Sequence, residues 1–247
     1  MKTNIQNKFY TSISKYYSEI FPYNPAQLNF IRNKVGQLAG KQILDIGCAT
    51  GELAFQLAQS GARVTGMDLN EDLLQQAKKN KAHPDCTFLV GNMLDLEKYF
   101  ATCQFDAVLC FGNTLVHLEH KEQIRQMFQG VYSVLQPGGY FLIQILNYDY
   151  IFKEQITELP IIESENIKFI RKYKFGNHSD NLIFQTHLFI KPKLQEISNE
   201  TQLLALKSKD LKDLLNQANF AEIEFYSNFK MDSFGGNHLP LVLICRK

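Results

Sequence analysis

The sequence has no tryptophan and almost no net charge. Its 26 Lys and Arg residues stand against 25 Asp and Glu residues, for a formal net charge of +1. Nucleic-acid binding depends on clustered cations that displace counterions, so this balance disfavours a nucleic-acid partner. No apolar run of about 18 residues is present, so we expect no membrane-spanning segment and no membrane partner. The start, MKTNIQNKFY, lacks the apolar stretch of a secretory signal.

Cysteine is also scarce, and none of it is arranged as Cys-x-x-Cys. Five cysteines occur: Cys48, Cys86, Cys103, Cys110 and Cys245. An odd number without that spacing argues against a disulfide framework and against a zinc site. We therefore expect a reduced, cytoplasmic protein that holds no metal ion.

The central part of the chain alternates between short apolar runs and helical patterns. A length of 247 residues with 45% hydrophobic content fits one α/β domain with an insertion. Apolar runs separated by helices are typical of a parallel sheet covered on both faces. We predict strands at 42–46, 63–68, 86–91, 105–111 and 140–146, and helices at 52–59, 71–80 (with Asn70 as N-cap) and from about 121 to the stop at 136–139.

The two flanking regions follow other patterns. Residues 1–35 are aromatic and helix-like, and we expect a helical cover there. In residues 147–206, roughly alternating strands surround a turn cluster at 176–181, and 196–206 supplies a third strand, which predicts an antiparallel lid. Residues 36–146 and 207–247 form the remaining domain, ending in a helix that Ser208 caps and in strands at 223–227 and 241–246.

The most informative stretch is ILDIGCATGEL (43–53), followed by GMDL (66–69). Gly47 and Gly51 stand between a strand and a helix, where the chain turns sharply and a ligand can approach its backbone. Asp68 ends the next strand, where it can accept hydrogen bonds from the hydroxyls of a ribose. The pattern therefore predicts a nucleoside ligand.

The charge of this loop bears on which nucleoside it binds. A dinucleotide fingerprint beginning at Gly47 would need glycines where Ala49 and Glu52 stand, and a carboxylate at position 52 would repel a pyrophosphate. A Walker loop is excluded because no Gly-Lys-Ser/Thr follows. S-adenosylmethionine, which has no phosphate and carries positive charge, suits the loop better.

The motif DIGCATG, with an acidic residue at the end of the next strand, resembles that of class I S-adenosylmethionine-dependent methyltransferases. The resemblance continues in order through VGNML (90–94), FDAVLCFGNTLVHL (105–118) and LQPGGYFLIQ (135–144), and NQANFAEIEFY (216–226) is similar to the family's penultimate strand and its lead-in. It implies a doubly wound, seven-stranded, mostly parallel sheet of order 3-2-1-4-5-7-6, a Rossmann-like methyltransferase fold, with the lid inserted after the fifth strand.

The resemblance also implies the contacts of the cofactor S-adenosylmethionine. Asp68 would hold the ribose and Leu69 would pack on the adenine. Gly47 and the neighbouring backbone would hold the methionine moiety, Asn92 and Met93 would flank the adenine edge, and the Cys110 backbone would approach the amino-acid end. The other implied cofactor-binding residues are Asp45, Cys48 and Gly51.

Two segments resemble one branch of this family more closely. GNTLVHL (112–118) and LNYDYIF (146–152) are similar to segments of the glycine and sarcosine N-methyltransferases. In that branch the asparagine contacts the substrate amine, which implies such a role for Asn113. The branch clamps a carboxylate with an arginine where Leu146 stands here. Leucine cannot bind a carboxylate, so we expect another small amine or hydroxyl compound as substrate.

Several further residues have two interpretations each. His117 could act as general base, because its unperturbed pKa lies near neutrality, or it could cap the helix near Lys121 or pack beneath the lid. Tyr10, Tyr16 and Tyr17 could line the pocket or simply pack. Arg171 could clamp an anion or lie on a solvated face.

Three functions remain to be separated. The leading one is a methyltransferase acting on a small-molecule acceptor, as a monomer or homodimer. The others are a nucleotide-dependent oxidoreductase on a related sheet and a non-catalytic module that binds S-adenosylmethionine. The segment after the fourth strand is GNTL rather than D/N-P-P-Y/F, which disfavours methylation of adenine N6 or glutamine.

Overall fold

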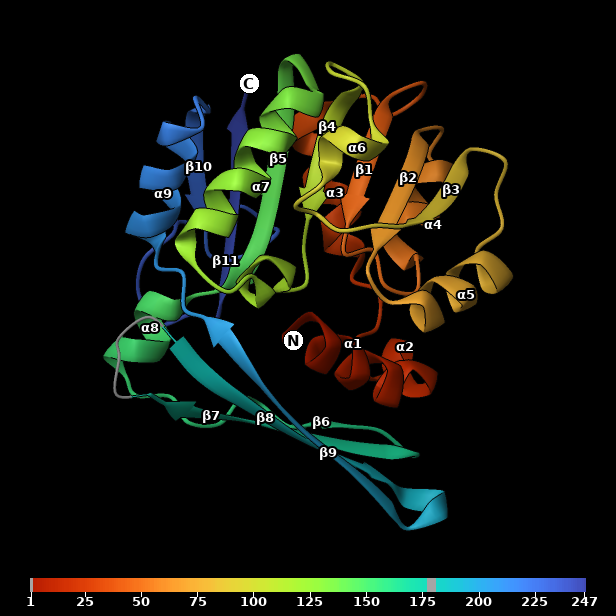
Figure 1. The fold of residues 1–247 in the computed structure, drawn as a ribbon, viewed down its shortest axis with the longest axis vertical. Coiled ribbons are helices and arrows are strands. Elements are labelled where there is room, and N and C mark those ends of the chain that lie inside the picture. The colour runs from red at the N-terminus through yellow and green to blue at the C-terminus, as the bar shows by residue number, and fades with distance from the viewer. Residues whose placement is uncertain (1, 177–180) are drawn as a thin grey trace.

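The computed structural model describes residues 2–176 and 181–247. These residues form a seven-stranded sheet and a separate four-stranded sheet. The larger sheet and its helices occupy the upper part of Figure 1, and the smaller sheet lies below them, with the N-terminal helix between the two.

The seven-stranded sheet has the order β10-β11-β5-β4-β1-β2-β3, which confirms the predicted order as seen from its other edge. β1 is parallel to both β2 and β4, whereas β11 runs antiparallel to β5 and to β10. The strands are β1 (Gln42–Ile46), β2 (Arg63–Asp68), β3 (Cys86–Val90), β4 (Phe105–Cys110), β5 (Leu135–Leu146), β10 (Ala221–Tyr226) and β11 (Pro240–Arg246).

Helices cover both faces of this sheet because its inner strands are apolar on both sides. The α3 and α4 side chains Phe30 and Leu57 pack with Ile43 of β1 on one face. On the other face, Phe128 of α7 and Leu211 of α9 belong to the larger core cluster. The helices of this half are α3 (Pro25–Val35), α4 (Glu52–Gln59), α5 (Glu71–Asn80), α6 (Leu96–Tyr99), α7 (Lys121–Val134) and α9 (Ser208–Gln217).

The beginning of β5 differs from the prediction. The helix α7 ends before residues 136–139 as expected, but these residues belong to β5 rather than to a separate turn. The C-terminus explains the difference, because Lys247 accepts a hydrogen bond from the Gly138 N–H (2.9 Å) and donates one to the Gly139 carbonyl (3.0 Å). The pairing of β5 with β4 is irregular here, shifting between Phe105 and Ala107.

The four-stranded sheet confirms the predicted antiparallel lid and extends it. Its order is β6-β7-β8-β9, and the third predicted strand is present, slightly shifted. The short elements β6 and α8 were not predicted, and residues 177–180 of the predicted turn cluster lie outside the described residues. The elements are α8 (Tyr148–Lys153), β6 (Ile162–Glu163), β7 (Ile167–Phe175), β8 (Asn181–Ile190), the 3-10 helix Lys191–Lys193 and β9 (Gln195–Leu204).

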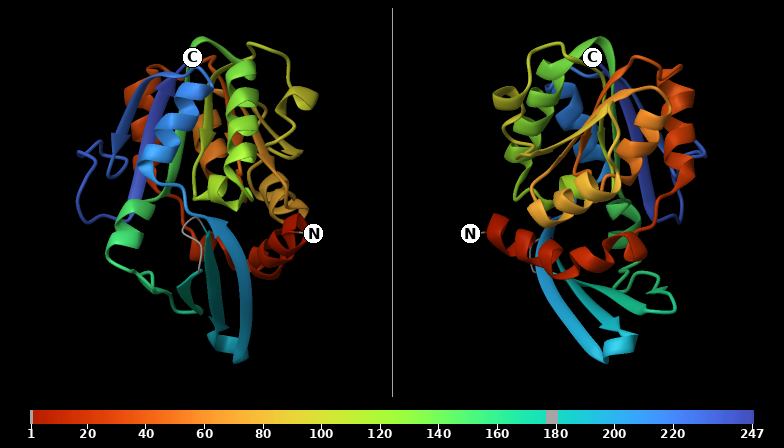
Figure 2. Two further views of the ribbon diagram at one scale, coloured as in Figure 1. Left: turned by 60° about the vertical axis from the view of Figure 1, so that its left-hand side comes forward. Right: turned by 90° about the vertical axis from the view of Figure 1, so that its right-hand side faces the viewer.

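The N-terminal helices lie between the two sheets, as both views in Figure 2 show. They comprise α1 (Lys2–Ile13), the 3-10 helix Ser14–Tyr16 and α2 (Tyr17–Ile20). Phe9, Ile13 and Ile20 are buried against Phe169 and Leu188 on the inner face of the smaller sheet. Residues 2–20 of the predicted helical cover are therefore packed on the lid, whereas α3, from the same predicted region, packs on the larger sheet. No helix in residues 2–176 or 181–247 is long and apolar enough to cross a membrane.

The start of α9 corrects one capping prediction. Ser208 is the first residue of the helix, its N-cap is Lys207, and no side chain of the cap residue binds the helix end. Instead, the Asp149 carboxylate accepts a hydrogen bond from the Ser208 N–H at 2.8 Å. A carboxylate near a helix N-terminus satisfies a free N–H and opposes the positive end of the helix dipole. The residue that stabilises α9 therefore comes from α8.

Replacing Asp149 with alanine should lower the free energy of unfolding by about 1 kcal/mol, the scale for losing a helix-capping acceptor. In a chain of this size that corresponds to a fall in Tm of roughly 2–4 °C. Asp213→Ala, which removes an exposed carboxylate from the same helix, is the matched control and should leave Tm almost unchanged. Equal Tm values for the two variants would contradict the capping role.

Candidate active site

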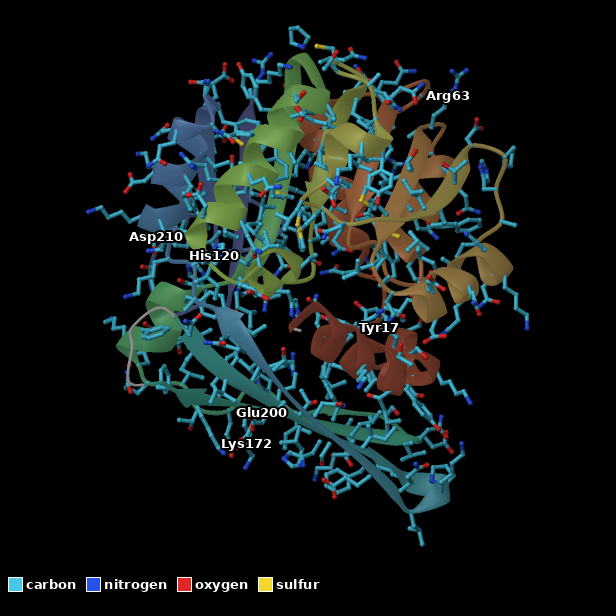
Figure 3. The ribbon with its side chains drawn as sticks, viewed as in Figure 1. Tyr17, Arg63, His120, Lys172, Glu200 and Asp210 are labelled. Atoms are coloured by element: carbon cyan, nitrogen blue, oxygen red, sulfur yellow. The ribbon has the colours of Figure 1, made fainter. Side chains whose placement is uncertain are left out.

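Loops at the carboxyl ends of β1, β2, β3 and β4 meet at one edge of the larger sheet. Figure 3 marks the orientation: Arg63, which begins β2, lies at the far end of the sheet, and Tyr17 of α2 lies near the end where β2 finishes. In open α/β sheets, ligands bind outside the carboxyl ends of the strands. The structure places a pocket at this edge, and α1 and α2 contribute to its wall.

The loop after β1 is held in a conformation that glycine favours. Gly47 has φ +74°, and a Cβ atom there would lie 2.5 Å from both Cγ2 and Oγ1 of Thr114. Gly51 has φ +76°, and a Cβ atom there would lie 2.6 Å from the Phe88 ring. Ala49 adopts the left-handed region with φ +48°. The glycines are therefore required by the turn and by close packing behind it.

Asp68 is the charged group at the centre of this edge. One carboxylate oxygen accepts the Ala49 N–H (2.9 Å) and the other accepts the Asn70 N–H (2.8 Å). Burial raises the pKa of Asp68, and these backbone hydrogen bonds oppose the rise. Among the described residues no cationic side chain forms an ion pair with it. A carboxylate has about four acceptor positions, so it keeps capacity for the hydroxyls of a ligand.

The pocket contains part of the predicted site. Gly47, Asp68, Leu69, Asn92, Met93 and His117 line it. The full lining comprises Gln6, Asn7, Tyr10 and Tyr17 from α1 and α2, Ile46, Gly47 and Ala49 after β1, Met67, Asp68, Leu69, Asn70 and Leu73 around the end of β2, Gly91, Asn92, Met93 and Leu94 after β3, and Gly112, Thr114, His117, Leu118, Glu119 and Gln123 after β4.

Four of the predicted cofactor-binding residues do not line this pocket. Asp45, Cys48 and Cys110 are buried, and Gly51 is the N-cap residue that precedes α4. Burial, followed by the nearby Asp68 carboxylate, raises the pKa of Asp45 to about 7. Burial likewise raises the pKa of the Cys110 thiol, so packing is the role that the structure supports for its side chain. Any contact of these residues with a cofactor stays a prediction.

Asn113 stands beside the pocket with its amide already engaged. The Leu146 N–H donates to its side-chain oxygen (3.0 Å), and its amide nitrogen donates to the Tyr148 hydroxyl (3.2 Å). Its backbone adopts φ +65°, and its neighbours Gly112 and Thr114 do line the pocket. In this arrangement Asn113 fixes the loop after β4 to the end of β5. The predicted contact with a substrate amine stays a prediction.

Glu52 has a different environment from the one that the sequence suggested. It does stand in the first turn of α4, but its carboxylate pairs with Lys81 at 2.9 Å and it does not line the pocket. The acidic groups that line the pocket are Asp68 and Glu119. The pocket is therefore lined by acidic groups, but these are Asp68 and Glu119 rather than Glu52.

His117 and Tyr10 meet across the pocket. The Tyr10 hydroxyl lies 2.8 Å from Nε2 of His117. The N-cap of α7 is His120, so His117 does not cap that helix. Of the three N-terminal tyrosines, Tyr10 and Tyr17 line the pocket and Tyr16 does not. Arg171 is half-buried in the lid and donates to the Pro160 carbonyl at 2.8 Å, rather than lying on a fully solvated face.

Some lining residues were missed by sequence reasoning. Gln6 and Asn7 precede the aromatic stretch that drew attention to the N-terminus, and Glu119 and Gln123 follow the GNTLVHL motif. Polar residues at the start of an amphipathic helix carry no local signal of a distant partner. Within the described residues, no group of three or more His, Cys, Asp or Glu side chains is placed to hold a metal ion.

Substituting asparagine for Asp45 should stabilise the ligand-free protein more as pH rises. A folded-state pKa near 7, against 3.8 unfolded, means that the folded state binds more protons, so this group's contribution to stability is lost between about pH 4 and pH 7. Asp45→Asn lacks this loss. We expect its Tm advantage over wild type to grow by at least about 2–4 °C between pH 5 and pH 8, the change that 1 kcal/mol produces.

Thermal melts at the two pH values check this expectation, with Asp213→Asn as the exposed control whose Tm difference should not vary with pH. A Tm advantage of Asp45→Asn that is constant or shrinks with pH would contradict it.

The sequence around this pocket is similar to known methyltransferases. Residues 43–139 match a family model described as a methyltransferase domain. A protein of Geobacillus sp. (strain WCH70), assigned by its name to the methyltransferases, is 35% identical over 158 residues, which are 60% of this chain and 62% of that protein. The match thus spans less than two thirds of the relative's length.

Solved structures resemble the whole chain. The CcbJ methyltransferase from Streptomyces caelestis has a TM-score of 0.79 at 19% identity, covering 95% of each chain. CalS10, an amino pentose methyltransferase from Micromonospora echinaspora described with S-adenosylmethionine bound, has a TM-score of 0.67 at 15% identity, covering 94% of each chain. At these identities the likeness concerns the fold. The similarity to the glycine and sarcosine branch stays a prediction.

Proposed function

We propose that the chain is a class I S-adenosylmethionine-dependent methyltransferase and that it transfers a methyl group to a small-molecule amine or hydroxyl acceptor. The observation that carries the proposal is the single pocket in which the Asp68 carboxylate, the Gly47 turn and the Tyr10–His117 pair face a common space.

The residues present fit S-adenosylmethionine. Asp68 is half-buried, has no ion-pair partner in the described part of the chain and offers acceptor positions to a ribose. Leu69 and Met93 supply apolar surface for an adenine. Gly47 lines the same pocket, where its backbone would adjoin the methionine moiety. When bound, this cofactor supplies a methyl group already activated by a sulfonium.

The protein's own part is to position the acceptor and exclude water. Residues of α1 and α2 close the pocket on the side away from the strands, and Tyr10, Thr114 and His117 place polar groups in its wall. The lid packs on the other side of these helices (Figure 1). This enclosure, together with a net charge of +1, supports a small acceptor rather than a nucleic acid. We keep a cytoplasmic location as a proposal, supported by five cysteines that are all free thiols.

The test is transfer of label from methyl-tritiated S-adenosylmethionine to a panel of small amines and alcohols, with isothermal titration of S-adenosylhomocysteine in parallel. We expect micromolar or tighter binding and labelled product from at least one acceptor. Hydride transfer from a reduced nicotinamide, or thermal stabilisation by a pyrophosphate cofactor without any response to S-adenosylhomocysteine, would refute the proposal. Tight binding without turnover across the panel would favour a non-catalytic module.

A further inference from the structure

Two side chains from distant parts of the chain form a hydrogen-bonded pair in the wall of the pocket. Tyr10 belongs to α1, and His117 ends the 3-10 helix Thr114–His117. We propose that this pair is the proton acceptor of the reaction, with the Tyr10 hydroxyl facing the methyl acceptor and passing its proton to Nε2 of His117. This inference rests on the proposed function.

The geometry suits proton transfer. The Tyr10 oxygen lies 2.8 Å from Nε2 of His117, and the rings meet edge to face with centroids 5.5 Å apart. This distance is within the range for a general base and its proton donor. Both residues line the pocket, so a bound acceptor can reach the tyrosine oxygen. A neutral imidazole accepts from the hydroxyl, and the imidazolium cannot.

The surroundings keep Tyr10 protonated. The groups that face the pair are Asp68 at the end of β2, Tyr148 of α8, Tyr17 of α2 and Glu119 of the loop that leads to α7. Burial is the largest cause that raises the pKa of Tyr10 well above its usual value, and the Asp68 charge adds to it. Tyr10 therefore cannot act as a free phenolate. It can act as a relay, because it gains a proton as it gives one up.

The proton and electron balance closes without any additional reactant. The lone pair of the acceptor nitrogen or oxygen forms the new bond to the methyl carbon, and the carbon–sulfur bond breaks, leaving its electron pair on a neutral thioether. The proton of the acceptor passes to the Tyr10 oxygen, and the Tyr10 proton passes to Nε2 of His117. The imidazolium then returns this proton to water. A base of this kind serves an acceptor that carries a proton, as amines and hydroxyls do.

The position of Tyr10 depends on how α1 is held. The Asn70 amide donates to the Asn7 carbonyl (3.2 Å) and to the Thr11 hydroxyl (3.0 Å), one residue beyond Tyr10. The Gln76 amide donates to the Ser14 carbonyl at 3.0 Å. The Asn70 N–H in turn binds Asp68, the expected ribose ligand. Asn70 therefore links Asp68 to α1, the helix that carries Tyr10.

The experiment compares Tyr10→Phe, His117→Gln and the double variant with wild type, using the best acceptor found in the amine and alcohol panel. Each single variant should lower kcat by about 10²- to 10⁴-fold, the range for losing a general base. The double variant should lose no more than either single one, because both residues act in one relay. The Kd for S-adenosylhomocysteine should stay within about threefold of wild type.

Tyr16→Phe is the matched control. It removes a hydroxyl from the adjoining 3-10 helix, one that accepts from Lys193 at 3.2 Å and does not line the pocket. Its kcat should equal that of wild type. Additive losses in the double variant, or an effect of Tyr10→Phe on Kd or KM with kcat unchanged, would overturn the relay.

A second measurement needs no acceptor. In the S-adenosylhomocysteine complex, the ¹⁵N signals of the His117 ring should show Nε2 unprotonated and hydrogen-bonded, and Tyr10→Phe should shift the Nε2 signal. An unshifted signal would overturn the proposed pair. Failure of wild type to bind S-adenosylhomocysteine would instead refute the proposed function, so the two failures are distinguishable.

Discussion

Valine at position 47 is expected to abolish S-adenosylmethionine binding, leaving no heat of titration with S-adenosylhomocysteine. The new Cβ would stand 2.5 Å from two atoms of the Thr114 side chain, closer than real Cβ atoms come to any neighbour. The loops after β1 and β4 would have to separate, and both loops line the pocket. The left-handed backbone at φ +74° adds about 1–2 kcal/mol of strain for any residue with a Cβ.

The Gly40→Val variant tests the effect of backbone strain in the absence of a steric clash. Gly40 has nearly the same backbone angle, φ +77°, but a Cβ atom there would meet nothing within 4 Å. It should lower Tm modestly and leave binding intact. If Gly47→Val does not fold, Gly47→Ala with and without Thr114→Ala gives the answer, because alanine at 114 removes both atoms at 2.5 Å and should restore part of the binding. A folded Gly47→Val that binds as tightly as wild type would contradict the assignment.

Alanine at position 68 is expected to weaken S-adenosylmethionine binding by roughly 10- to 150-fold, which corresponds to about 1.5–3 kcal/mol for the loss of hydrogen bonds to a charged group. The same carboxylate also holds the Ala49 and Asn70 N–H groups. The variant therefore loosens the cofactor loop as well as removing the ribose acceptor. Isothermal titration measures the change in Kd directly.

Two further variants test whether the carboxylate itself is responsible. Asp68→Asn keeps one acceptor oxygen and should bind more tightly than Asp68→Ala but less tightly than wild type. Glu71→Ala removes an exposed negative charge from the start of the following helix, so it controls for a general electrostatic effect and should leave Kd unchanged. An Asp68→Ala variant with wild-type Kd would refute the ribose assignment.

The larger sheet could be predicted from the sequence because its signals are local. The apolar runs at 42–46 and 63–68 coincide with β1 and β2, and Asn70 caps α5 as expected, its side chain accepting from the Leu73 N–H. The strand order came from the family resemblance, since pattern alone does not choose between edges. Periodicity could not identify α8 because it spans only Tyr148–Lys153, too few residues for a helical pattern.

The pocket was only half predictable for a related reason. Asp68 and Gly47 lie within one strand-helix-strand unit, β1-α4-β2, so the sequence places them together. Tyr10 and His117 are 107 positions apart and meet only through tertiary packing. The same holds for Asn113, whose amide binds Leu146 and Tyr148. No local pattern records such contacts.

The hydrogen bond between Asp149 and the N–H of Ser208 holds together the two ends of the inserted segment. This hydrogen bond closes the loop formed by residues 150–207. Each doubling of the length of such a loop raises the entropic cost of closing it by only about 0.6 kcal/mol. Extra residues are tolerated best at the far tip beside the exposed Leu194, well away from the residues that line the pocket. The fold thus permits the smaller sheet to lengthen at its tip while the pocket stays unchanged.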